Sequence, residues 1–238
     1  QPGTGKSTLI SDLTSEFDGG KIKFTSLNCT QVQADDLIRL IALNFGLDAT
    51  TEYKSLLLHG LKELFLKMHN EGRRSLLIID EAQDLPANAL EELRLLTNLQ
   101  QNNQPLLQIF LVGQSELRQT IKTPQLEQLH QRIVATCHLA PLGIDETENY
   151  IMYRLEQVGW NDNPTFDPRI FAPIQKVSQG IPRLINLVCS RLMLHGMVDE
   201  KHHIDMNDLK VVLASLSNEE LIPKYDFAEK APAILRSI

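Results

Sequence analysis

The sequence has no apolar run near the ~20 residues that a helix needs to cross a bilayer, although 42% of its residues are hydrophobic. It also has no excess of positive charge, since 23 basic residues against 30 acidic ones leave a formal net charge of −7. These two absences exclude a membrane-spanning protein and argue against a surface devoted mainly to nucleic acid.

Cysteine is scarce as well, because the 238 residues contain only Cys29, Cys137 and Cys189. Their odd number and wide spacing exclude a disulfide framework and a cysteine zinc site. Since they lie among apolar residues, we expect reduced core thiols in a cytoplasmic protein. The chain opens at Gln1 without an initiator methionine or a signal peptide, so we expect a fragment.

Apolar spacing in the first part of the chain predicts helices that alternate with short strands. Ser75–Ile79 reads as a parallel strand covered on both faces, because its run is short and mostly apolar. Further strands are predicted at Lys21–Cys29, Leu106–Val112 and Val134–Leu139. This alternation predicts an α/β core of three layers with a mostly parallel sheet over residues 1–142.

After Pro141 the spacing becomes helical throughout, without strand signals. Four amphipathic helices are predicted, and Asp205 followed by Asp208 resembles the N-cap of the last one. We therefore expect an all-helical domain over residues 143–216 and a loosely attached tail over residues 217–238.

The strongest chemical signal lies at the N-terminus, where an amphipathic helix opens on Gly3-Thr4-Gly5-Lys6-Ser7-Thr8. The run matches a phosphate-binding loop, G-x-x-x-x-G-K-[ST], whose first glycine would precede residue 1. Backbone N–H groups of such a loop surround phosphates, and the helix N-terminus adds its positive dipole end. We expect Lys6 to reach the β- and γ-phosphates of ATP and Ser7 to ligate Mg²⁺.

An apolar strand that ends in two carboxylates, Asp80 and Glu81, is the expected partner of this loop. Asp80 would hold the hydration shell of Mg²⁺ opposite Ser7. Glu81 would polarise the water that attacks the γ-phosphate. A nucleotide kinase needs no such group, so the pair predicts an ATPase with ATP and Mg²⁺ as its cofactors.

Several runs resemble AAA+ ATPases of the general secretion pathway protein A type: Asp80-Glu81-Ala82-Gln83-Asp84-Leu85, Leu93–Leu99, Val112-Gly113-Gln114, Gln128–Arg132 and Gly180–Asn186. Within that family, Ala34–Leu40 and Val158-Gly159-Trp160 look most like the secretion ATPases encoded beside exosortase and exopolysaccharide genes, the PEP-CTERM loci. The resemblance reaches from residue 1 to about residue 216. It implies an AAA+ core, whose first strand would precede the phosphate-binding loop, and a helical lid.

The resemblance also implies roles by position. Gln114 looks like sensor 1, which orients the attacking water, and Arg183 looks like sensor 2, a lid arginine that contacts the γ-phosphate. Arg132 resembles the arginine finger that one subunit supplies to its neighbour, with Arg118 as a rival. Plain structural roles stay open: a turn cap for Gln114 and surface ion pairs for Arg183 and Arg132.

The predicted function is Mg²⁺-dependent ATP hydrolysis that drives envelope secretion or the assembly of a polysaccharide-export system. The resemblance implies a homo-oligomer joined through Arg132, export proteins as partners, and a cytoplasmic location with peripheral attachment to the inner membrane through those partners as an option. Two alternatives stay open. One is a DNA-associated AAA+ regulator of the initiator or transposition type, and the other is an ATP-binding switch with little hydrolysis.

Overall fold

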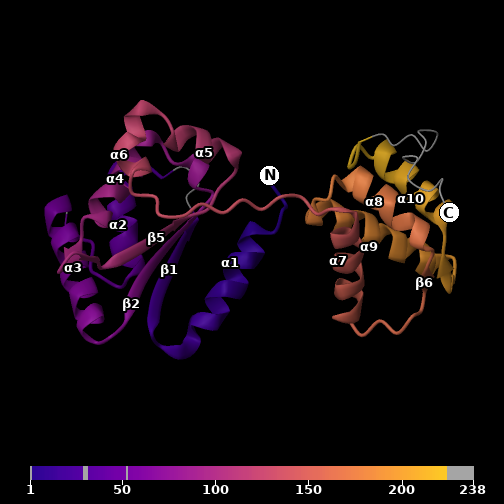
Figure 1. Cartoon of the computed structure of the whole chain (residues 1–238), viewed down its shortest axis with the longest axis horizontal. Helices are drawn as coiled ribbons and strands as arrows, with labels where there is room; N and C mark the ends of the chain where they lie inside the picture. The colour runs from indigo at the N-terminus through magenta and orange to yellow at the C-terminus, as the bar shows by residue number, and fades with distance from the viewer. Residues whose placement is uncertain (1, 29–31, 52, 224–238) are drawn as a thin grey trace, which may run out of the picture. The chain divides into compact units, whose positions relative to one another are not determined.

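The computed structural model describes residues 2–28, 32–51 and 53–223, which form two compact units (Figure 1). Among the described residues, the first unit comprises Pro2 and residues 6–138, and the second comprises residues 3–5 and 139–223. The domain limits at residues 142 and 216 stay predictions. Cys29 and the part of the predicted tail from residue 224 onward lie outside the described residues.

A parallel sheet of three strands stands at the centre of the first unit, in the order β1 (Ile22–Asn28), β2 (Arg74–Asp80) and β5 (Leu107–Leu111). The central strand β2 is buried from Ser75 to Ile79, as its apolar run predicts. The register places Asn28 beside Asp80 and Ile79 beside Leu111. The carboxyl ends of the strands therefore meet at one edge, where α/β proteins place ligand sites.

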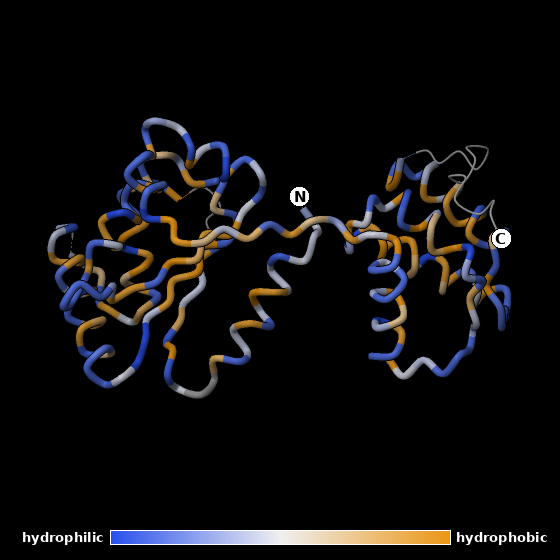
Figure 2. Tube along the Cα trace, in the orientation of Figure 1, coloured by the Kyte–Doolittle hydropathy of each residue, from blue (hydrophilic) through white to orange (hydrophobic). Residues whose placement is uncertain are grey.

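The helices of the first unit are α1 (Lys6–Ser15), α2 (Ala34–Asn44), α3 (Lys54–Asn70), α4 (Ala87–Thr97), α5 (Ser115–Ile121) and α6 (Glu127–His130). The apolar core packs α2, α3 and α4 on the sheet face that carries Leu77 and Ile79. Helix α1 lies on the other side of the sheet (Figure 1) and alternates between apolar and polar positions (Figure 2). No residue of α1 is buried.

The sheet ends at β5, whose outer edge pairs with no strand in the described part of the chain. The predicted strand at Val134–Leu139 is therefore wrong: these residues form neither strand nor helix, and Val134 is 99% exposed. An alternating sequence becomes a strand only where a neighbouring backbone supplies ladder hydrogen bonds. After α4, the strands β3 (Gln100–Gln101) and β4 (Gln104–Pro105) form a short antiparallel hairpin.

The second unit contains α7 (Ile144–Glu156), α8 (Phe171–Ser178), α9 (Pro182–Val198) and α10 (Met206–Asn218), around an apolar core of its own. This unit was predicted to be all-helical, but it also contains a short pair of strands, in which β6 (Thr165–Phe166) pairs with β7 (His203–Ile204). Two residues per strand are too few to show a period in the sequence. None of the described helices in either unit is long and apolar enough to cross a bilayer.

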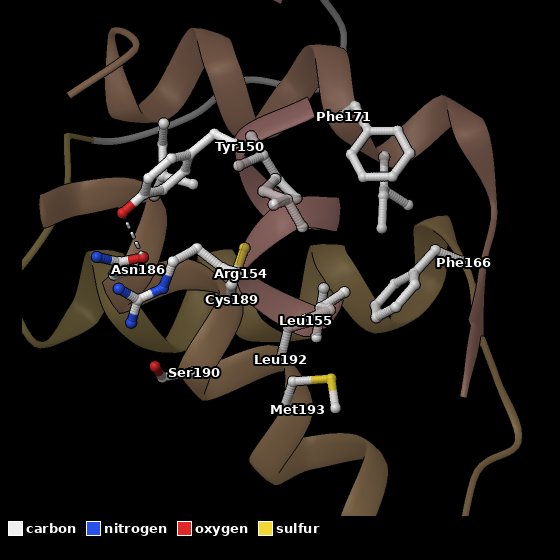
Figure 3. A pocket seen from close by; sticks show the side chains of 14 residues that line it. Tyr150, Arg154, Leu155, Phe166, Phe171, Asn186, Cys189, Ser190, Leu192 and Met193 are labelled. Carbon is white, nitrogen blue, oxygen red and sulfur yellow. Dashed lines mark hydrogen bonds between the residues drawn. The ribbon is translucent and has the colours of Figure 1, made fainter. Parts of the chain in front are cut away.

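Side chains of α7, α8 and α9 line a pocket of about 370 Å³ in the second unit (Figure 3). At one end, the Tyr150 hydroxyl donates a hydrogen bond of 3.1 Å to Asn186 Oδ1. Cys189 lines the pocket, and burial raises the pKa of its thiol to about 12, so this cysteine is inert at neutral pH. Cys137 is exposed, which corrects the expectation of a core thiol, because the segment around it belongs to no strand.

Asp208 anchors the last helix, because its buried carboxylate accepts hydrogen bonds from the backbone N–H of Asp205 and from the ammonium of Lys201. Asp205 caps α10 in return, by accepting from the N–H of Asp208 at 3.2 Å, which confirms the predicted N-cap. Burial opposes ionisation, but these hydrogen bonds hold the pKa of Asp208 below its usual range.

We expect Asp208→Asn to lower the free energy of unfolding of the second unit by about 2 kcal/mol at neutral pH. Because the folded carboxyl has a lowered pKa, this stability is present above the unfolded pKa and is lost as pH falls through the folded value. The two proteins should therefore converge in acid. Urea unfolding followed by the fluorescence of the single tryptophan, Trp160, measures this. Glu148→Gln, at an exposed acid on α7, is the matched control, and equal stability at neutral pH would contradict the prediction.

Candidate functional site

The phosphate-binding sequence lies where it was predicted, at the start of a helix. Helix α1 begins at Lys6, and the preceding Gly3 and Gly5 have φ angles of 83° and 90°. These left-handed angles suit glycine, and they let the backbone curl before the helix starts. The first helical turn therefore carries Lys6, Ser7 and Thr8, of which Ser7 and Thr8 are exposed.

Ser7 and Asp80 meet at the carboxyl edge of the sheet. The Ser7 hydroxyl donates a hydrogen bond of 2.8 Å to Asp80 Oδ2, across 73 residues of sequence. A hydroxyl beside a carboxylate offers the hard oxygen ligands that Mg²⁺ prefers, with the remaining positions left to water and phosphate oxygens. This pair is therefore the candidate Mg²⁺ site.

Glu81 follows β2 in a left-handed conformation, with φ 51° and ψ 39°. Its carboxylate Oε2 accepts from the side-chain amide of Gln83 at 2.6 Å and from that of Gln114 at 3.4 Å. The hydrogen bond from Gln83 does most to hold the pKa of Glu81 below its ordinary value, and Gln114 and the positive charge of Lys6 add to it against partial burial. Glu81 is therefore an ionised carboxylate at neutral pH, as a base requires.

Gln83 is a site residue to which the sequence analysis gave no role. Its Oε1 accepts the backbone N–H of Gln114 at 3.0 Å while its Nε2 donates to Glu81. A Cβ at Gly113 would lie 2.7 Å from that Oε1, so glycine permits the approach. One feature of the sequence could have indicated this role: Gln83 lies two residues beyond the candidate base, and its amide can both donate and accept hydrogen bonds.

Arg183 lies in the second unit, at the second position of α9, which begins at Pro182. Its backbone N–H donates to Gly3 O at 3.2 Å, and a Cβ on Gly3 would lie 2.7 Å from Arg183 Cβ. The Arg183 residue is exposed. The structure therefore joins Arg183 to the backbone of the glycine-rich loop, and its role as sensor 2 stays a prediction.

Arg132 is exposed at the end of the α6 segment, where it lines a polar surface depression with Glu127, Gln128 and Gln131. Within the described residues its guanidinium makes no hydrogen bond or ion pair, and the same holds for the exposed Arg118. The surface ion pair considered for Arg132 is therefore not formed here. Neither arginine contacts Ser7, Asp80 or Glu81, and the finger role of Arg132 stays a prediction.

Comparison with known proteins identifies the family to which the chain belongs. A family model described as an AAA domain matches residues 1–121. The chain is 36% identical over 220 residues to General secretion pathway protein A of Aeromonas hydrophila, covering 90% of this chain and 39% of that protein. The chain thus spans about two fifths of that relative.

Solved structures show the same fold at low sequence identity. Cdc6p from Pyrobaculum aerophilum has a TM-score of 0.67 at 18% identity, over 90% of this chain and 59% of that one. The RuvB Holliday junction branch migration motor of Thermotoga maritima has a TM-score of 0.58 at 20% identity, with the same coverage. The α/β AAA+ fold with a parallel sheet and C-terminal helices is therefore confirmed. Because the family model covers residues 1–121 of 238, just over half of the chain, this protein belongs to the AAA domain family of P-loop NTPases.

Proposed function

We propose that this domain binds Mg²⁺-ATP and hydrolyses it to ADP and phosphate. The observation that carries the proposal is the convergence at the end of β2, where Ser7 bonds to Asp80 and the adjoining Glu81 is held by two amides. AAA domains typically bind ATP with Mg²⁺, and the residues present suit that pair.

Each residue has a defined task in this proposal. Lys6 binds the β- and γ-phosphates, and Ser7 and Asp80 hold Mg²⁺, which neutralises phosphate charge when bound. Glu81 accepts a proton from water as the water oxygen bonds to the γ-phosphorus and the bond to the β-phosphate oxygen breaks. Gln114 orients that water, and Arg183 and Arg132 stabilise the charge of the transferring group from the lid and from a neighbouring subunit.

We further propose that hydrolysis drives envelope secretion or polysaccharide export. The support is the 36% identity to General secretion pathway protein A. On this basis the partners are export proteins, the protein works as a homo-oligomer in the cytoplasm, and it contacts the inner membrane peripherally through its partners. The likeness to the subgroup of exosortase and exopolysaccharide loci stays a prediction. The solved structures of Cdc6p and RuvB, at 20% identity or less, support the fold alone.

Lys6→Ala should weaken Mg²⁺-ATP affinity by about 10- to 150-fold, because the phosphates lose a charge-assisted hydrogen bond of about 1.5–3 kcal/mol. Isothermal calorimetry with purified protein measures the affinity. Lys122→Ala, at an exposed lysine after α5, is the matched control and should bind as the wild type does. Equal affinity in Lys6→Ala would refute the assignment of the phosphate-binding loop.

A further inference from the structure

The turn after β2 carries a bridge that none of the roles above explains. Gln83 lies in the 3₁₀ turn Ala82–Asp84, and its side-chain amide contacts two parts of the site at once. Its Nε2 donates to Glu81 Oε2 at 2.6 Å, and its Oε1 accepts the N–H of Gln114 at 3.0 Å. A single side chain therefore links the carboxylate at the end of β2 to the backbone that follows β5.

The link needs an amide, and the chemistry of its two ends shows why. The carboxylate of Glu81 can only accept when ionised, whereas the N–H of Gln114 can only donate. Between them, only a group with one donor and one acceptor satisfies both. Glutamate at position 83 could serve the N–H but would repel Glu81, and methionine, of similar length, could serve neither strongly.

Two further observations show that the arrangement is tight. Gly113 leaves space for Gln83, since a Cβ there would lie 2.7 Å from Oε1 and 2.9 Å from Leu117 Cδ2. Glu81 itself has a left-handed backbone, with φ 51°, which is uncommon outside glycine and points its side chain differently from an ordinary strand residue. Held by a turn of this kind, the carboxylate depends on its hydrogen-bond partners for a defined direction.

We propose that Gln83 is a positioning residue, which orients the carboxylate of Glu81 and locks it to the segment that carries Gln114. The inference rests on the proposed hydrolysis, in which Glu81 is the base. In that reaction, Gln83 keeps the carboxylate aimed at the water, and it ties this direction to the position of the Gln114 amide. A rearrangement of either strand end is then transmitted to the base through one side chain.

The test compares Gln83→Met and Gln83→Glu with the wild type in turnover, in Mg²⁺-ATP affinity and in melting temperature. We expect Gln83→Met to lower kcat by about 10- to 100-fold, because a small misplacement of a reacting group has effects of this order. ATP affinity should stay within about twofold, since Gln83 contacts none of the phosphate-binding residues.

The division of the effect between kcat and ATP affinity separates positioning from a plain structural role. A misdirected carboxylate should lower kcat and leave Mg²⁺-ATP affinity and the melting temperature near their wild-type values. Gln83→Glu should lose more kcat than Gln83→Met, because its carboxylate can accept the N–H of Gln114 but repels Glu81. Gln119→Met, at an exposed glutamine of α5, should leave both kcat and affinity unchanged.

Three outcomes decide the matter. A wild-type kcat in Gln83→Met overturns the proposal, and so does a lowered melting temperature with ATP affinity reduced as much as kcat in both variants, which would show a structural role. Glu81→Gln in the same assay is the third arm. If Glu81→Gln keeps normal turnover, the proposed function itself fails, whereas an inactive Glu81→Gln beside an unaffected Gln83→Met refutes only the role of Gln83.

Discussion

Glu81→Gln is expected to bind Mg²⁺-ATP as tightly as the wild type and to lose about 10²–10⁴-fold in kcat, the usual contribution of a general base. The substitution keeps the size of the side chain and an oxygen for the amide of Gln83 to bond, but it removes the carboxylate that takes the proton from water. Phosphate release under saturating ATP measures turnover, and calorimetry measures binding.

Glu116→Gln is the matched control, because Glu116 is an exposed acid on α5 outside the proposed site. Normal turnover in Glu81→Gln would show that another group is the base. The wild type offers a second check through pH. Because hydrogen bonds from Gln83 and Gln114 hold the pKa of Glu81 below its ordinary value, the acid limb of kcat/KM, which reports the free enzyme, should lie at lower pH than an unperturbed glutamate would give.

Arg132→Ala is expected to lower hydrolysis by about 10³–10⁵-fold, the range that arginine fingers reach in other P-loop enzymes, while ATP affinity barely changes. The reason is positional. The guanidinium is exposed and unpaired within the described residues, and it contacts none of the groups at the end of β2. An arginine that acts in a neighbouring subunit needs such exposure, since the partner's transition state supplies its counter-charge.

Mixing Arg132→Ala with Lys6→Ala protein tests whether this arginine acts between subunits. Interfaces that pair an intact Lys6 site with an intact Arg132 should regain part of the activity that each variant lacks alone. Head-to-tail contacts of this kind produce rings or helical filaments, so turnover per subunit should also rise with protein concentration. If mixed oligomers form and remain inactive, the trans role fails, and Arg118→Ala becomes the next variant to test.

Features that depend on residues close together along the chain could be predicted from the sequence alone. The helix start at Lys6, the start of α9 at Pro182 and the capping of α10 by Asp205 all follow from residues within a few positions. Their hydrogen bonds and φ angles are local, so local chemistry specifies them. The buried run of β2 could also be predicted from the sequence, because a strand covered on both faces is apolar along nearly its whole length.

Which distant segments of the chain lie side by side could be learned only from the tertiary structure. Whether Val134–Leu139 forms a strand depends on a neighbouring edge, and its own alternation carries no information about one. The same holds for the bridge of Gln83, whose two partners lie 2 and 31 residues away along the chain. Gln83 can reach both partners only because parallel pairing brings the ends of β2 and β5 together. The pairing then places one donor against a carboxylate and one acceptor against a backbone N–H, and this gives Gln83 its place in the site.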